Sequence, residues 1–232
     1  MRYLELDFIR GIAIILMVIF HLSYDLNYFH FITIDIYNQH SHFWYYFRLI
    51  IVSLFVGTVG ASIAVTYEFH YNIKKILRQV TKLALSSLSI TLVSYIMFPN
   101  YYIYFGILHF ITLAFILSLP FARYPISALI GGIIIIILTS FDIISTHPLF
   151  NFLQPLLSLP QRTKDLANFF PWFGVVLVGI YIGKNRLFRF QLKDIPSINK
   201  IVFLGQHSLL IYLIHQPLLY GITMLLYYYS KN

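Results

Sequence analysis

The chain has 232 residues, of which 59% are hydrophobic and only 10% are charged, with a mean hydropathy of +0.77. This balance excludes an ordinary soluble domain and indicates an integral membrane protein. The absence of cysteine excludes a disulfide framework, thiolate catalysis and cysteine-ligated metal centres. The formal charge of +8 is no sign of nucleic-acid binding here, because basic residues in a membrane protein first set its orientation.

Apolar segments along the chain predict an all-α, polytopic membrane helix bundle with about seven transmembrane helices. A bilayer core about 30 Å thick requires about 20 apolar residues per helical span. The predicted spans cover residues 8–29, 44–67, 79–98, 103–122, 125–141, 169–183 and 202–229. Prolines and a polar run interrupt residues 142–168, which we expect to form an outer loop. Without an internal repeat or a linker, residues 1–232 are expected to be one domain.

The basic residues predict the orientation of the bundle. Alternate loops place 12 of the 16 lysines and arginines on the side of the N-terminus, which predicts that this side is cytoplasmic. These 12 residues are Arg2, Arg10, Lys74, Lys75, Arg78, Lys82, Arg123, Lys184, Arg186, Arg189, Lys193 and Lys200. Small residues recur at helical spacing in two spans, Gly57 with Ala61 and Gly179 with Gly183, and are expected to let helices approach closely.

The ionisable residues of the first span share one face of the predicted helix. Asp7, Arg10, His21 and Asp25 fall within a stripe about 60° wide at 100° per residue. Asp7 and Arg10 are three residues apart and are expected to form an ion pair. Asp25 follows His21 by one turn, where a carboxylate can fix the imidazole tautomer and raise its basicity, as in a general base or nucleophile. The alternative is a polar pair that only holds helices together.

Two further polar residues are predicted at the depth of His21 and Asp25. Arg48 either extends to the outer interface, pairs with Asp25 or stabilises a developing oxyanion. His109 has no polar neighbour in the sequence, and its alternative role is a structural hydrogen bond. Ionisable groups inside spans are costly and commonly mark a functional site.

The seventh span carries Ser208, Tyr212 and His215 at helical spacing, followed by Pro217, with His207 near its cytoplasmic end. This stripe is expected to point into the bundle, on a helix bent by the proline. Its alternative role is hydrogen bonding between helices. No pair of histidines has a third ligand nearby, so no metal site is predicted.

Four stretches resemble, in the same order, segments of bacterial and archaeal members of the heparan-alpha-glucosaminide N-acetyltransferase catalytic-domain family. They are residues 2–13 with His21 and Asp25, residues 105–109, residues 170–183 and residues 205–217. The resemblance implies a membrane acetyltransferase within the transmembrane acyltransferase superfamily. Such an enzyme is expected to move an acetyl or related acyl group from cytoplasmic acyl-coenzyme A to an acceptor on the outer side. The expected donor is acetyl-coenzyme A, and the acceptor is typically a sugar or amino sugar.

Site roles follow from the resemblance together with the polar pattern. His21 serves as general base or acyl carrier oriented by Asp25, and His109 completes the catalytic set. Arg48, Ser208, Tyr212 and His215 are assigned to the substrate. The residues assigned to the donor, whose phosphates suit basic side chains, are Asp7, Arg10, Lys74, Lys75, Arg78 and His207.

Several points stay open at this level. In the lysosomal branch of the family the catalytic histidine lies nearer the position of His30, so His30 and His109 are alternatives to His21. The alternative role of the basic residues is that they only orient the protein in the membrane. The sequence leaves open the acceptor, the acyl chain length and whether transfer is to nitrogen or oxygen. It also leaves open whether the mechanism is covalent or uses a ternary complex, and whether the protein forms a homo-oligomer. A prokaryotic cell membrane is the expected location.

Two other function classes fit a buried polar line. A proton-coupled transporter or flippase uses chains of His and Asp, although the sequence shows no inverted repeat. A bis-histidine haem carrier would use two of His21, His109 and His215 and would show a haem absorption band.

Overall fold

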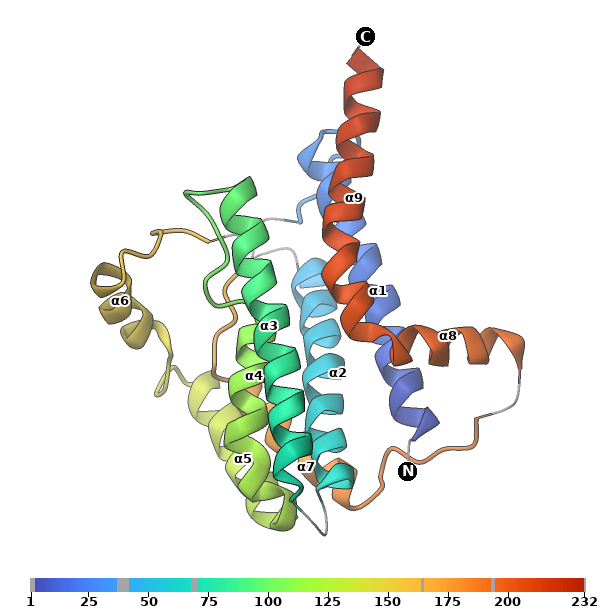
Figure 1. Cartoon of the computed structure of the whole chain (residues 1–232), viewed down its shortest axis with the longest axis vertical. Coiled ribbons are helices and arrows are strands. Elements are labelled where there is room, and N and C mark those ends of the chain that lie inside the picture. The colour runs from blue at the N-terminus through green and yellow to red at the C-terminus, as the bar shows by residue number, and fades with distance from the viewer. Residues whose placement is uncertain (1–2, 37–41, 68–70, 164, 193–194, 232) are drawn as a thin grey trace. The chain divides into compact units, whose positions relative to one another are not determined.

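The computed structural model describes residues 3–36, 42–67, 71–163, 165–192 and 195–231, whose regular secondary structure is helical (Figure 1). This confirms the predicted all-α fold class. An isolated parallel bridge between Phe105 and Leu166 accompanies the helices. The helices are α1 (Leu4–Tyr28), α2 (His42–Thr66), α3 (Ile73–Met97), α4 (Ile107–Ser118), the 3-10 helix η1 (Leu119–Arg123), α5 (Pro125–Ser140), α6 (His147–Leu156), α7 (Trp172–Lys184), α8 (Pro196–Gln206) and α9 (Ser208–Lys231).

Four helices, α1, α2, α3 and α9, are long and apolar enough to cross a membrane. They correspond to the predicted spans one, two, three and seven. The other three predicted spans are shorter apolar helices at Ile107–Arg123, Pro125–Ser140 and Trp172–Lys184. The predicted seventh span is not one continuous helix, because α8 ends at Gln206 and α9 begins at Ser208.

The chain divides into two compact units, and the division falls inside α2. The first unit contains residues 1–55 and 189–232, and the second contains residues 56–188. Candidate residues of α1, α8 and α9 therefore belong to the first unit. His109 and the basic residues at the start of α3 belong to the second.

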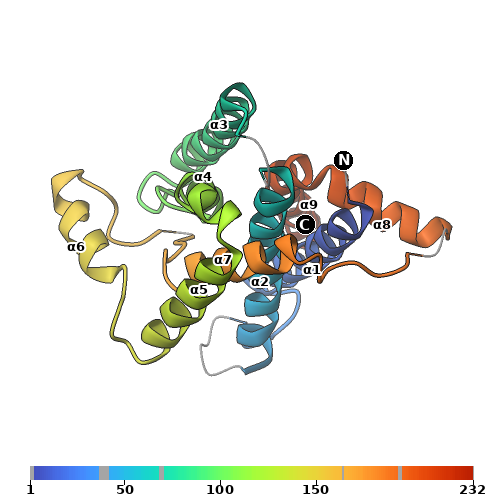
Figure 2. The same cartoon turned by 90° about the horizontal axis from the view of Figure 1, so that it is seen from below.

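In the first unit, α1 packs against both α8 and α9 (Figures 1 and 2). The apolar side chains of Ile14 and Met17 recur at helical spacing and are buried with Ile51 of α2. Glycine allows α1 and α8 to touch by their backbones: a Cβ on Gly11 would collide with the Ile201 carbonyl, and one on Gly205 with the Asp7 carbonyl. This contact fixes the N-terminal half of α1 beside the end of α8.

In the second unit, α5 packs against α7 and α3 packs against α4. The small residues predicted to allow close helix packing do so here. A Cβ on Gly179 of α7 would collide with the Gly57 carbonyl of α2, and one on Gly183 with the Ala61 carbonyl. The predicted loop over residues 142–168 contains α6, and it meets the connection between α3 and α4 where Leu166 pairs with Phe105.

Candidate active site

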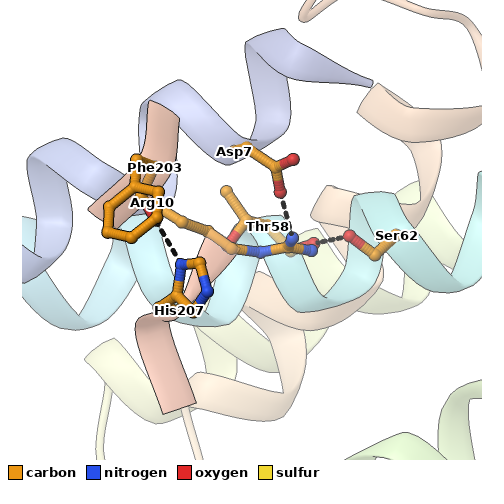
Figure 3. Close-up of polar contacts among 6 residues, drawn as sticks. All are labelled: Asp7, Arg10, Thr58, Ser62, Phe203 and His207. Carbon is orange, nitrogen blue, oxygen red and sulfur yellow. Dashed lines mark hydrogen bonds and ion pairs between the residues drawn. The ribbon is translucent and has the colours of Figure 1, made fainter. Parts of the chain in front are cut away.

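The N-terminal turns of α1 carry the predicted ion pair between Asp7 and Arg10. Nη1 of Arg10 lies 3.1 Å from Oδ1 of Asp7, whose side chain is buried (Figure 3). The pair forms because residues three apart lie on the same face of a helix. The paired guanidinium neutralises a carboxylate that would be costly to bury alone.

His207 lies at the junction between α8 and α9, which Figure 3 draws together with the Asp7–Arg10 pair. Its Nδ1 donates a hydrogen bond to the Phe203 carbonyl at 2.9 Å, and the two rings are in contact. The side chain is exposed. Because Gly205 touches the backbone of Asp7, the α8–α9 junction lies at the level of the ion pair.

His21 of α1 and His215 of α9 are in direct contact, with ring centroids 4.8 Å apart. Nδ1 of His21 donates to the Met17 carbonyl at 2.9 Å, and Nδ1 of His215 donates to the Tyr212 carbonyl at 2.8 Å. A carbonyl oxygen only accepts hydrogen bonds, so each neutral ring carries its hydrogen on Nδ1 and its lone pair on Nε2. The structure thus brings together two histidines whose Nε2 atoms carry the lone pair, from helices far apart in the sequence.

Asp25 is buried and contacts α9 through Gln216. Nε2 of Gln216 donates to the two carboxylate oxygens at 3.0 and 3.3 Å. This differs from the expectation that Asp25 orients His21, since the Met17 carbonyl sets the tautomer of that ring. It also differs from the suggested pairing of Asp25 with Arg48, whose side chain is exposed as an arginine extending to an interface would be.

Tyr212 of the α9 stripe lies on the side of the helix that faces α1. Tyr212 packs against the buried cluster of Ile14, Met17 and Ile51. Its ring also contacts that of His215. Ser208 begins α9, and the helix continues through Pro217 to Lys231.

His109 has polar partners that the sequence did not predict. Its Nδ1 accepts the Gly106 N–H at 3.2 Å, which caps the start of α4. Its Nε2 therefore carries the hydrogen and donates to Oγ1 of Thr91 at 3.1 Å, while that hydroxyl donates to the Ile103 carbonyl. Both nitrogens are engaged in holding α3, α4 and their connection, which is the structural alternative considered for this residue.

Lys74, Lys75 and Arg78 are exposed on the first turns of α3. The side chain of Asn72 caps this helix by accepting the Lys75 N–H, and no acidic residue occurs in the first turn. The ammonium of Lys75 lies 5.8 Å from the ring of Tyr67. The result is an exposed cationic surface at a helix N-terminus, which suits phosphate.

Gln216 is a functional candidate that the sequence indicated only as a hydrogen-bonding group and did not assign to the site. An amide is ordinary on a helix, and only its contact with the buried Asp25 distinguishes it. Its place beside His215, in a span with few polar residues, was the available signal. His30 is exposed and has a positive φ of 62° just after α1, and it takes no part in the His21–His215 contact.

The apolar helices and the buried polar residues of α1 and α9 define an integral membrane protein with a histidine-based candidate active site. The family described as heparan-alpha-glucosaminide N-acetyltransferase, catalytic, matches residues 2–217. The chain therefore belongs to this family, as the four sequence stretches indicated, and the family points to a membrane acetyltransferase. No curated protein and no solved structure matches the chain.

Proposed function

We propose that the protein transfers an acetyl or related acyl group from acyl-coenzyme A to a sugar or amino sugar, with His21 as the reacting residue. The observation that carries this proposal is the contact between His21 and His215, in which Nδ1 donation leaves both Nε2 lone pairs available. A histidine with a free Nε2 is suited to act as general base or nucleophile. The family match over both histidines supports acetyl transfer as the reaction.

Two chemical routes are compatible with this arrangement. In the covalent route, Nε2 of His21 attacks the thioester carbonyl, a C–N bond forms, and the C–S bond breaks to release coenzyme A. The acceptor then attacks the acyl carbon and loses its proton, and the C–N bond to His21 breaks. In the direct route, His21 removes the acceptor proton while the acceptor attacks the thioester carbonyl, and the C–S bond breaks to release coenzyme A. His109 is left out of the reacting groups because both of its nitrogens are engaged.

The residues proposed to bind the acyl donor, acyl-coenzyme A, come from both units. Lys74, Lys75 and Arg78 are proposed to bind the phosphates of coenzyme A, because they are exposed cations at the start of a helix whose first turn has no acidic residue. Asp7, Arg10 and His207 are proposed to shape the donor entrance of the first unit. On the acceptor side, Tyr212 and His215 are proposed to contact the substrate, and so are Ser208 and Arg48.

The proposed membrane topology has seven transmembrane helices, with the N-terminus in the cytoplasm. The four long helices and three shorter apolar helices support this number, and the bias of basic residues supports the orientation. We propose that both units act as one acyltransferase domain, since the family match extends over segments of each. The resemblance to bacterial and archaeal proteins supports a prokaryotic cell membrane as its location.

A transfer assay tests the function and its donor site together. Purified protein in detergent receives labelled acetyl-coenzyme A and glucosamine, and the variant Lys74→Glu/Lys75→Glu/Arg78→Glu is compared with wild type. Reversing three exposed charges should raise the KM for acetyl-coenzyme A about tenfold or more at low salt, and less at high salt. Arg162→Glu, which reverses an exposed charge in the loop before α7, is the matched control and should leave this KM unchanged.

The outcomes separate the two claims. Folded wild-type protein that transfers no acetyl group would contradict the proposed function. Transfer with an unchanged KM in the triple variant would contradict only the assignment of the donor phosphates to the start of α3.

A further inference from the structure

Two buried hydrogen-bond acceptors lie on neighbouring residues of α9 without a partner. They are Nε2 of His215 and Oε1 of Gln216. His215 is only 7% exposed. Buried polar atoms are nearly always paired, because leaving one unpaired forfeits the hydrogen bond that water provides. Two unpaired acceptors side by side therefore indicate a place where a ligand supplies the donors.

The orientation of each acceptor is fixed by a second hydrogen bond. Nδ1 of His215 donates to the Tyr212 carbonyl, so Nε2 has the lone pair. Nε2 of Gln216 donates to the two oxygens of Asp25, so the amide oxygen points away from the carboxylate. A carboxylate offers no donor, and the reverse orientation of the amide would set oxygen against oxygen. Asp25 thus determines which end of Gln216 is free.

Acyl transfer requires hydrogen-bond acceptors of this kind beside the reacting group. An acceptor with an amine or hydroxyl group must lose one hydrogen as its nitrogen or oxygen bonds to the acyl carbon. The bond from that carbon to its carrier breaks at the same time, and the leaving group retains the electron pair. In the covalent route His21 is the leaving group and His215 contacts it, so Nε2 of His215 is placed to take this proton. The Gln216 oxygen can hold the same group by a hydrogen bond.

We propose that Gln216 and His215 form the subsite that binds the N–H or O–H group of the acyl acceptor, with Asp25 as a positioning residue that acts through Gln216. This inference rests on the proposed acetyl transfer and goes beyond it by naming the groups that hold the acceptor. It gives Asp25 a role different from orienting His21. It also assigns Gln216, in place of Arg48, as the partner that Asp25 requires.

An exchange of the carboxylate and the amide tests this subsite. Asp25→Asn removes the charge that fixes the amide, and Gln216→Glu sets two carboxylates against each other. In Asp25→Asn/Gln216→Glu, the amide of residue 25 donates to the carboxylate of residue 216, whose second oxygen again faces the subsite. We expect each single variant to raise the KM for glucosamine about tenfold, the effect of losing one oriented hydrogen bond, and the double variant to restore most of it.

A second measurement separates acceptor binding from a general loss of structure. The KM for acetyl-coenzyme A should stay within about twofold of wild type in all three variants. A purely structural bond between α1 and α9 would change both substrates alike. If Asp25→Asn does not fold, Gln216→Met carries the test, because it keeps the length of the side chain and removes the amide. Gln206→Met, at the end of α8, is its control.

Three results would overturn the inference. One is an unchanged KM for glucosamine in folded Gln216→Met, and another is an equal rise of the KM for both substrates. In either case thiol release by wild type would leave the proposed function intact. Wild-type protein that neither releases thiol nor transfers an acetyl group would overturn the proposed function and this subsite with it.

Discussion

Three histidines within apolar helices differ in which nitrogen is free. His21 and His215 donate from Nδ1 to a carbonyl of their own helix, which leaves the Nε2 lone pair for chemistry. His109 accepts at Nδ1 and donates from Nε2, so neither nitrogen is free. The difference comes from position in the helix, since His109 is close enough to the start of α4 to accept the uncompensated Gly106 N–H.

A structural role of His109 predicts a loss of stability. His109→Ala removes the cap of α4 and the partner of Thr91, so the free energy of unfolding should fall by about 1–2 kcal/mol. Thr91→Val should cost a similar amount, and the two changes together should cost less than their sum because they break one network. Thermal unfolding in detergent measures all three variants.

Thr112→Val supplies the control for this prediction. Its hydroxyl bonds to the Leu108 carbonyl within α4, so its loss should change stability little. If folded His109→Ala kept the stability of wild type but lost acetyl transfer, His109 would instead belong to the catalytic groups.

At the residue scale, periodicity identified the polar face of α1 but not the partners of its side chains. Asp7 and Arg10 pair as predicted because both partners lie on one helix, three residues apart. Asp25 and Gln216 are 191 residues apart, and no local rule predicts which helices will meet. The partner of His21 was missed because a carbonyl one turn back is present in every helix and distinguishes no residue.

Individual helices pack most closely where glycine removes the side chain. Gly205 of α8 lies against the backbone of Asp7, and Gly11 of α1 lies against that of Ile201. In α9, by contrast, Gly221 has open space where a Cβ would be. The two kinds of glycine respond differently to the same substitution.

Gly205→Ala should therefore destabilise the first unit. The added methyl would meet backbone, which cannot rotate away, so α1 and α8 must separate at a cost of about 1–3 kcal/mol. Gly221→Ala should be neutral or stabilise α9 by up to about 1 kcal/mol, since alanine favours helix and meets no neighbour. Thermal unfolding of both variants provides the comparison, and equal midpoints would show that α1 and α8 do not touch at Gly205.

At the scale of elements, hydropathy identified the apolar helices and misplaced one boundary. Residues 202–229 form one apolar run, and the change of helix at His207 leaves no break in it. The predicted small-residue contacts were confirmed, but with an asymmetry that spacing cannot reveal. A Cβ on Gly179 would collide with the Gly57 carbonyl, whereas a Cβ on Gly57 would meet nothing.

For the whole molecule, composition was enough to indicate a membrane protein, and the family match extends over nearly all of the chain. Four helices are long enough to span a bilayer, whereas the three shorter ones fall below the length that hydropathy assumed. The proposed orientation in the membrane is supported by the distribution of basic residues alone. The division of the chain into two units, with its boundary inside α2, could not be predicted because the apolar run through α2 is continuous.

The proposed orientation predicts which loops are open to the outside. The chain has no cysteine, so single cysteines at Arg162 and Lys75 report accessibility without background. A membrane-impermeant thiol reagent applied to intact cells should label Arg162→Cys, and it should label Lys75→Cys only after the cells are opened. The reverse pattern would place the N-terminus outside.

The most direct test of the whole account measures thiol release from acetyl-coenzyme A by purified protein, with and without glucosamine. Wild type should release thiol, and folded His21→Ala should do so about a hundredfold more slowly or less, because it lacks the base or nucleophile. His42→Ala, which removes an exposed histidine, should match wild type. Acetylation of His21 without an acceptor would establish the covalent route. Turnover near wild type in folded His21→Ala, or its loss in His30→Ala alone, would contradict the account.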